Sequence, residues 1–118
     1  MLTAEQILGA ELHRVKVSVP EWGRMAETNG ESHVWVRELA GSEIGELALV
    51  QDDGGDSEVR ALARFCILGI CDTGGNRLFT PANEVELMRG PLAPLKRCAE
   101  EFVRINGLSE TEEAVLGK

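Results

Sequence analysis

Hydrophobic residues recur at helical spacing between Glu58 and Cys71, the most apolar stretch of the chain. They follow one face of a helix, and further apolar residues widen that face until little of it is polar. We therefore expect a central, deeply buried helix. A turn rich in Asp, Gly and Asn follows from Asp72 to Arg77, after which Leu78 and Phe79 return to the core. The helical pattern is carried by Val59, Leu62, Ala63, Cys66 and Ile70, with Phe65, Ile67 and Leu68 beside them.

Two stretches near the N-terminus alternate between apolar and polar residues, as half-buried strands do. They run from His13 to Val19 and from His33 to Arg37. We expect them to pair antiparallel across a loop from Pro20 to Ser32. The dipeptide Asn29-Gly30 in that loop is a hairpin-turn signal, so residues from Met25 to Thr28 are expected to extend the ribbon.

Helix start and stop signals place the remaining elements. Thr3 and Gln6 resemble a capping box, and Ser42 is a plausible N-cap. Thr80 followed by Pro81 opens another helix. A last amphipathic helix begins near Leu92 and includes Phe102 in its apolar stripe.

These elements predict an α+β fold, a mostly helical single domain with a small antiparallel β-hairpin near the N-terminus. We assign residues 1–108 to this domain. Residues 109–118 are predicted to form an acidic, mobile tail.

Composition and charge exclude several classes of partner. The 118 residues carry a formal net charge of -8, and aromatic residues make up 4% of the chain. A polyanion would be repelled, and few rings are available for base stacking, so we predict no nucleic-acid partner. Three cysteines without CxxC spacing, no signal-peptide pattern and no long apolar run predict a soluble cytoplasmic protein without a membrane partner.

The sharpest chemical motif is Asp72-Thr73-Gly74, the string that carries the catalytic carboxylate of retroviral-type aspartic proteases. The same residues are common in turns, and the helical period before Asp72 favours the turn. A calcium loop beginning at Asp72 would place Asn83 where a glutamate is needed. His13, His33 and the cysteines lack zinc-ligand spacing. We predict no catalytic residue, no metal and no cofactor.

The two tryptophans have two interpretations each. Trp22 either folds over the ribbon or is exposed, and Trp35, which is predicted to point away from Val34 and Val36, either covers a helix or is exposed. An exposed Trp would be suited to anchoring a protein partner.

Several strings occur in an order that resembles the tail assembly chaperones of long-tailed bacteriophages and prophages. Relative to that family, the stretch from Arg24 to Ser32 lengthens one connection. The strings that carry the resemblance are Met1 to Leu8, Val19 to Gly23, Val34 to Leu39, Gly41 to Glu43, Cys71-Asp72, Gly75 to Thr80, and Asn106 to Glu110.

The resemblance implies a non-enzymatic protein that binds the tape measure protein, keeps it soluble and promotes assembly of the tail tube protein around it. It also implies action in the bacterial cytoplasm and absence from the mature virion. We further expect a homo-oligomer. The alternatives are a head-tail joining component and, remotely, a protease using Asp72. The partner-binding surface is expected on the C-terminal helix face or around Trp22, Trp35, Leu78, Phe79 and Phe102.

Overall fold

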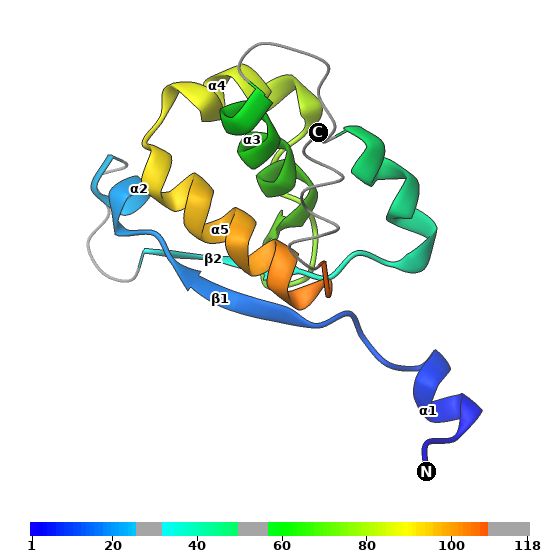
Figure 1. The fold of residues 1–118 in the computed structure, drawn as a ribbon. Coiled ribbons are helices and arrows are strands. Elements are labelled where there is room, and N and C mark those ends of the chain that lie inside the picture. The colour runs from blue at the N-terminus through cyan, green and yellow to red at the C-terminus, as the bar shows by residue number, and fades with distance from the viewer. Residues whose placement is uncertain (26–31, 50–56, 109–118) are drawn as a thin grey trace.

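The computed structural model describes residues 1–25, 32–49 and 57–108, and it has the predicted α+β architecture (Figure 1). A three-stranded antiparallel sheet supports a larger helical layer. The strands are β1 (Arg14–Ser18), β2 (His33–Arg37) and β3 (Ile70–Cys71). The α-helices are α1 (Ala4–Leu8), α2 (Pro20–Met25), α3 (Ser57–Gly69), α4 (Glu84–Arg89) and α5 (Leu92–Ile105), and the 3-10 helices are η1 (Gly41–Leu49) and η2 (Pro81–Asn83).

The predicted pairing of the two N-terminal strands is confirmed. β1 and β2 run antiparallel, with Val15 opposite Val36 and Val17 opposite Val34. Alternate residues of a strand face opposite sides of a sheet, so these valines share the side covered by the helices. That side of the sheet forms part of the hydrophobic core, because Val17 and Val36 are buried there.

The structure corrects the end of the central helix. We expected helix through Cys71, but α3 ends at Gly69, and Ile70 and Cys71 form β3, with Ile70 opposite Val36. The chain reverses after Cys71, where a bridge to Arg77 closes a tight hairpin. That reversal brings Arg77 back beside Cys71. The segment Ile70–Cys71 itself pairs with β2, and this pairing outweighs the helical period of its sequence.

The structure also corrects the connection after β1. Pro20 opens the short helix α2, in which the amide of Trp22 donates to the carbonyl of Val19 at 3.0 Å. Proline fixes φ near the helical value and needs no amide partner in a first turn, so Pro20 favours this start. Trp22 therefore lies on a helix rather than in a loop, and Met25 belongs to that helix rather than to a ribbon. The remaining predicted ribbon residues 26–28, the turn at 29–30 and the predicted tail 109–118 lie outside the described residues.

Most predicted helix ends are confirmed. The capping box of α1 is formed, with the amide of Gln6 donating to Oγ1 of Thr3 at 3.2 Å. The helix predicted after Thr80 begins as η2 and continues as α4 to Gly90. The segment predicted to be helical after Ser42 is the 3-10 helix η1.

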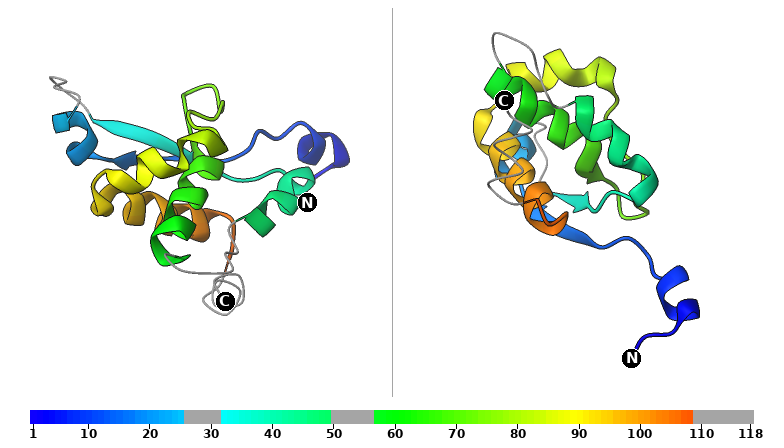
Figure 2. Two further views of the ribbon diagram at one scale, coloured as in Figure 1. Left: turned by 90° about the horizontal axis from the view of Figure 1, so that it is seen from above. Right: turned by 45° about the vertical axis from the view of Figure 1, so that its right-hand side comes forward.

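Helices α3 and α5 form the centre of the helical layer, and α5 lies across β1 and β2 (Figures 1 and 2). Phe65 of α3 and Phe102 of α5 contact each other with ring centroids 5.3 Å apart. Helix α1 lies beyond the end of β1, away from this body (Figure 2).

Candidate partner-binding surface

The five residues predicted to bind a partner lie in three separate places. Trp22 of α2 and Phe79 meet edge to face, with ring centroids 6.5 Å apart and ring planes inclined by 62°. Both are half-buried and pack on the core. Leu78, beside Phe79 in the chain, is 48% exposed. This group therefore presents one exposed leucine beside two half-buried rings.

Trp35 lies on the other side of the sheet. As expected from the alternation of β2, it faces away from Val34 and Val36. Its ring is 6.1 Å from the ring of His33 and 6.0 Å from the Arg14 guanidinium. These neighbours leave Trp35 half-buried, and it covers the outer face of the sheet rather than α5.

Phe102 is a core residue, with 1% of its surface exposed. It belongs to the apolar stripe of α5, where the helix faces α3 and the sheet, and it packs against Phe65 and Gly69. A partner could contact Phe102 directly only if α5 moved off α3. Its influence on binding would therefore be exerted through the position of α5.

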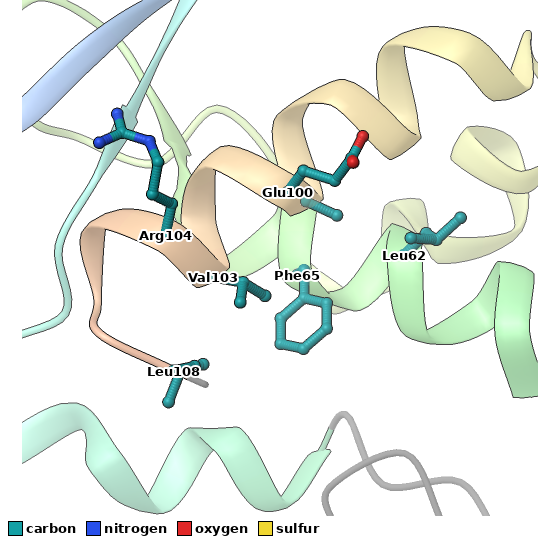
Figure 3. Close-up of a pocket in the computed structure, with 7 residues that line it drawn as sticks. Leu62, Phe65, Glu100, Val103, Arg104 and Leu108 are labelled. Atoms are coloured by element: carbon teal, nitrogen blue, oxygen red, sulfur yellow. The ribbon is translucent and has the colours of Figure 1, made fainter. Parts of the chain in front are cut away.

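A groove that the five predicted residues do not include runs between α3 and α5 (Figure 3). Its volume is about 330 Å³, and its floor is apolar. Glu100 and Arg104 of α5 lie at its rim. We call it the α3/α5 groove; the residues that line it are Leu62, Phe65, Ala99, Glu100, Val103, Arg104 and Leu108.

A second apolar surface is formed by residues 1–12, which we call the N-terminal arm. Every residue of the arm is exposed, and α1 buries none of its side chains. Leu8 is 85% exposed and Ile7 is 58% exposed. Exposed leucine and isoleucine side chains grouped on so short a segment are suited to contact with another protein surface.

Ion pairs fix the outer face of the sheet to η1. Arg37 of β2 is 8% exposed and donates two hydrogen bonds to the Glu43 carboxylate, at 3.1 and 2.9 Å. Arg77 donates a third bond to Glu43, at 3.2 Å. The hydrogen bonds from Arg37, followed by a backbone bond from Ala40 and the charges of both arginines, lower the pKa of Glu43 from 4.5 to about 2.

Asp72 closes the turn that follows β3. Its Oδ1 accepts hydrogen bonds from the amides of Gly74, at 2.8 Å, and Asn76, at 3.0 Å. The bond from Asn76 and its neighbours lowers the pKa of Asp72. An aspartic protease needs two carboxylates that share a proton, which raises one pKa. The structure therefore accounts for Asp72 as a turn residue, although a short strand rather than a helix precedes it.

Two further observations concern the part of the chain that the structure describes. No three residues among its His, Cys, Asp and Glu gather as metal ligands would. No helix in these ranges is long and apolar enough to cross a membrane.

The groove and the arm had weak signals in the sequence. Val103 belongs to the apolar stripe of the last helix, whose face was the alternative location for the binding surface. The arm shows a capping box followed directly by the apolar residues Ile7 and Leu8. Neither pattern reveals which apolar side chains stay uncovered, because that depends on how the helices pack.

Comparison with known proteins identifies the fold. No protein-family model matches the sequence, and no curated protein matches it. Among solved structures, the chain is similar to the tail assembly chaperone of bacteriophage HK97, with a TM-score of 0.52 and 21% sequence identity. The similarity covers 81% of this chain and 94% of that chain. The two proteins therefore share a fold over nearly all of the solved chain.

Proposed function

We propose that this protein is a phage or prophage tail assembly chaperone that binds the tape measure protein and has no enzymatic activity. The observation that carries the proposal is the fold shared with the HK97 tail assembly chaperone. The sequence strings at Val19 to Gly23, Val34 to Leu39 and Gly75 to Thr80 resemble the same family. The sequence strings are similar to the family in their residues, and the HK97 structure is similar in its backbone fold.

The chemistry of the surface is compatible with that role. A protein that keeps long amphipathic helices in solution must cover their apolar side chains. The α3/α5 groove offers an apolar floor for such side chains. The net charge of -8 keeps the resulting complex soluble and disfavours its aggregation with other copies.

We place the tape measure contact in the α3/α5 groove and at Leu78, with the half-buried Trp22 and Phe79 beside it. Trp35 is a second, separate contact on the outer face of the sheet. Phe102 takes part by holding α5 against α3. The tail tube protein is the other proposed partner, bound while tubes assemble in the host cytoplasm.

Co-expression with the tape measure protein encoded nearby tests this proposal. We expect the wild-type chain to raise the soluble fraction of the tape measure protein and to co-purify with it. Val103→Asp places a charge in the groove and should abolish both effects. Leu92→Asp, at an exposed position of the same helix, is the matched control and should retain them.

Two results would refute the chaperone role. One is an unchanged soluble fraction of the tape measure protein when the chain is present. The other is recovery of the chain as a component of purified virions, which is the result expected of a head-tail joining protein.

A further inference from the structure

A pocket separate from the α3/α5 groove lies at the outer face of the sheet. It is formed where the start of β1 and the end of β2 meet the turn that follows β3, and its volume is about 380 Å³. We call it the arginine pocket; the residues that line it are Glu11, Leu12, Arg14, Arg37, Gly74 and Gly75.

The arginine pocket contains two positive charges directly opposite each other. Arg14 of β1 pairs in register with Arg37 of β2. In the neighbouring pair, the amide of Glu38 donates to the carbonyl of His13 at 2.8 Å. The two arginines therefore form a non-hydrogen-bonded pair, the kind in which side chains stand closest. Like charges at such positions destabilise a sheet, so this arrangement favours a negative group beside the two guanidinium groups.

The chain supplies a negative group for Arg37, through Glu43, but not for Arg14. Arg14 is half-buried, lies 6.0 Å from the ring of Trp35 and forms no ion pair within the described ranges. A half-buried charge without a partner is costly, and this chain has 20 acidic residues against 12 basic ones. Every other buried or half-buried arginine in those ranges pairs with a glutamate: Arg37, Arg60, Arg64, Arg77 and Arg97.

Arg37 retains a hydrogen-bond donor that is not used. Its bonds to Glu43 come from Nη1 and Nη2. In the part of the chain that the structure describes, no acceptor meets the buried Nε of Arg37 or the buried Nε1 of Trp35. Buried donors without a partner are rare in proteins, and these two belong to side chains on the same face of β2. The outer face of the sheet therefore has donors and positive charge in excess of its acceptors.

We propose that the arginine pocket binds the side-chain carboxylate of a glutamate or aspartate of the tape measure protein, an inference that rests on the proposed function. Arg14 donates to the carboxylate, and Arg37 adds a second positive charge beside it. Stacking on Trp35 holds the Arg14 guanidinium in place. Gly75, with a φ of 85°, keeps the wall beside Arg14 free of a side chain, because a Cβ there would lie 3.9 Å from Nη1 of Arg14.

Two features favour an acidic side chain over a free anion. Leu12 gives the pocket an apolar wall, which suits the methylene groups of glutamate. The net charge of -8 repels free anions, whereas a side chain is brought to the pocket by the other contacts of its own protein. Arginine and tryptophan are also the residues that most often anchor protein interfaces.

Titration of the purified chain with blocked amino acids tests the chemistry of the pocket. The probe is the α-amide of N-acetylglutamate, whose single carboxylate is in the side chain; the α-amide of N-acetylglutamine is its uncharged control. The glutamate probe should shift the indole N–H resonance of Trp35, identified by its loss in Trp35→Phe, with a Kd of about 1–10 mM. Arg14→Gln should abolish the shift. Glu11→Gln should tighten binding, because it removes a like charge from the pocket lining.

Three results of the titration would overturn the proposal. Equal shifts with the two probes, or no shift by about 50 mM, would show that the pocket does not recognise a carboxylate. Tighter binding of inorganic phosphate than of the glutamate probe would make the pocket a site for free anions rather than for a protein side chain.

Binding to the tape measure protein tests the partner. Arg14→Gln should weaken binding by about tenfold or more, because it removes a charged hydrogen bond. Arg14→Lys keeps the charge without the planar fork and should lie between the two. Arg89→Gln removes the same charge from an exposed position of α4 and is the matched control, with binding like the wild type. Arg14→Gln should unfold at nearly the wild-type urea concentration, since relief of repulsion from Arg37 offsets the lost stacking on Trp35.

The outcomes separate this inference from the chaperone role. Wild-type binding that Arg14→Gln leaves unchanged would overturn the carboxylate contact and leave the chaperone role standing. Weaker binding that merely follows a loss of stability in Arg14→Gln would also overturn it, because Arg14 would then act through the fold. A wild-type chain that does not bind the tape measure protein would refute both the chaperone role and the partner assigned to the pocket, while the titration still decides whether the pocket binds carboxylates.

Discussion

A Cβ atom on Gly69 would lie 2.5 Å from Cδ1 of Phe102, closer than any side chain can be accommodated without movement. Gly69 is the last residue of α3, and Phe102 lies near the end of α5. The missing side chain therefore sets how closely the two central helices approach.

Replacing this glycine should destabilise the whole fold. We expect Gly69→Ala to lower the free energy of unfolding by about 1–3 kcal/mol, as overpacking of a core does. Urea unfolding followed by tryptophan fluorescence measures the change. Gly41→Ala is the control, because a Cβ there meets nothing within 4 Å. Equal stabilities for the two variants would contradict the close packing of Gly69 on Phe102.

The ion pair between Glu43 and Arg37 should support the contact between η1 and the sheet. Glu43→Gln removes the carboxylate that faces the nearly buried Arg37 guanidinium. We expect a loss of about 2 kcal/mol at pH 7, between the values for exposed and fully buried charge pairs. Glu11→Gln, at an exposed position of the arm, is the control and should change little. A Glu43→Gln variant as stable as that control would show that the pair has no net effect.

The same pair predicts how stability depends on pH. Bonds from Arg37 hold the pKa of folded Glu43 at about 2, whereas its ordinary value is 4.5. The folded form therefore releases this proton more readily, so its contribution to stability is complete above about pH 4.5 and is lost as the pH falls towards 2. Glu21, whose pKa is lowered to about 2 by hydrogen bonds from Arg97, should add to the loss in the same window.

Unfolding measured between pH 7 and pH 2 checks this. The wild-type chain should lose stability mainly below pH 4.5. The curve for Glu43→Gln should be flatter in that range, and one parallel to the wild type would contradict the assignment.

The three cysteines should be inert in the folded protein. Cys66 is buried, and its contact with Cys98 together with desolvation raises its pKa well above the ordinary value. Burial also raises the pKa of Cys71. Because the thiolate is the reactive form, labelling by a disulfide reagent at pH 8 should be slow and should rise with denaturant concentration. Rapid labelling of any of the three without denaturant would mean that the core opens readily.

Asp72 should matter for the turn and not for catalysis. Asp72→Asn keeps an oxygen that can accept from the amides of Gly74 and Asn76, so we expect a small change in stability. Asp72→Ala removes this acceptor and should cost about 1 kcal/mol. Thermal unfolding of the two variants compares them. If the wild-type chain had proteolytic activity and Asp72→Asn abolished it, the protease alternative would be supported.

The sequence by itself determined the local elements. Alternation fixed β1 and β2 and their pairing, because a period of two residues has one buried side. Side-chain caps at Thr3 and Thr80 fixed helix starts, since they act within one turn. The turn at Asp72 could also be predicted from the sequence, because the residues that form it are close together in the chain.

Only the tertiary structure decided what depends on distant contacts. Ile70 continues a helical period, yet it lies in β3, where it pairs with Val36 of β2, a residue far from it in the sequence. Phe102 and Val103 are neighbours in one apolar stripe, but packing against Gly69 buries the first and leaves the second at the edge of a groove. Periodicity shows that a face is apolar, whereas burial of each side chain on it depends on the shape of the opposing helix.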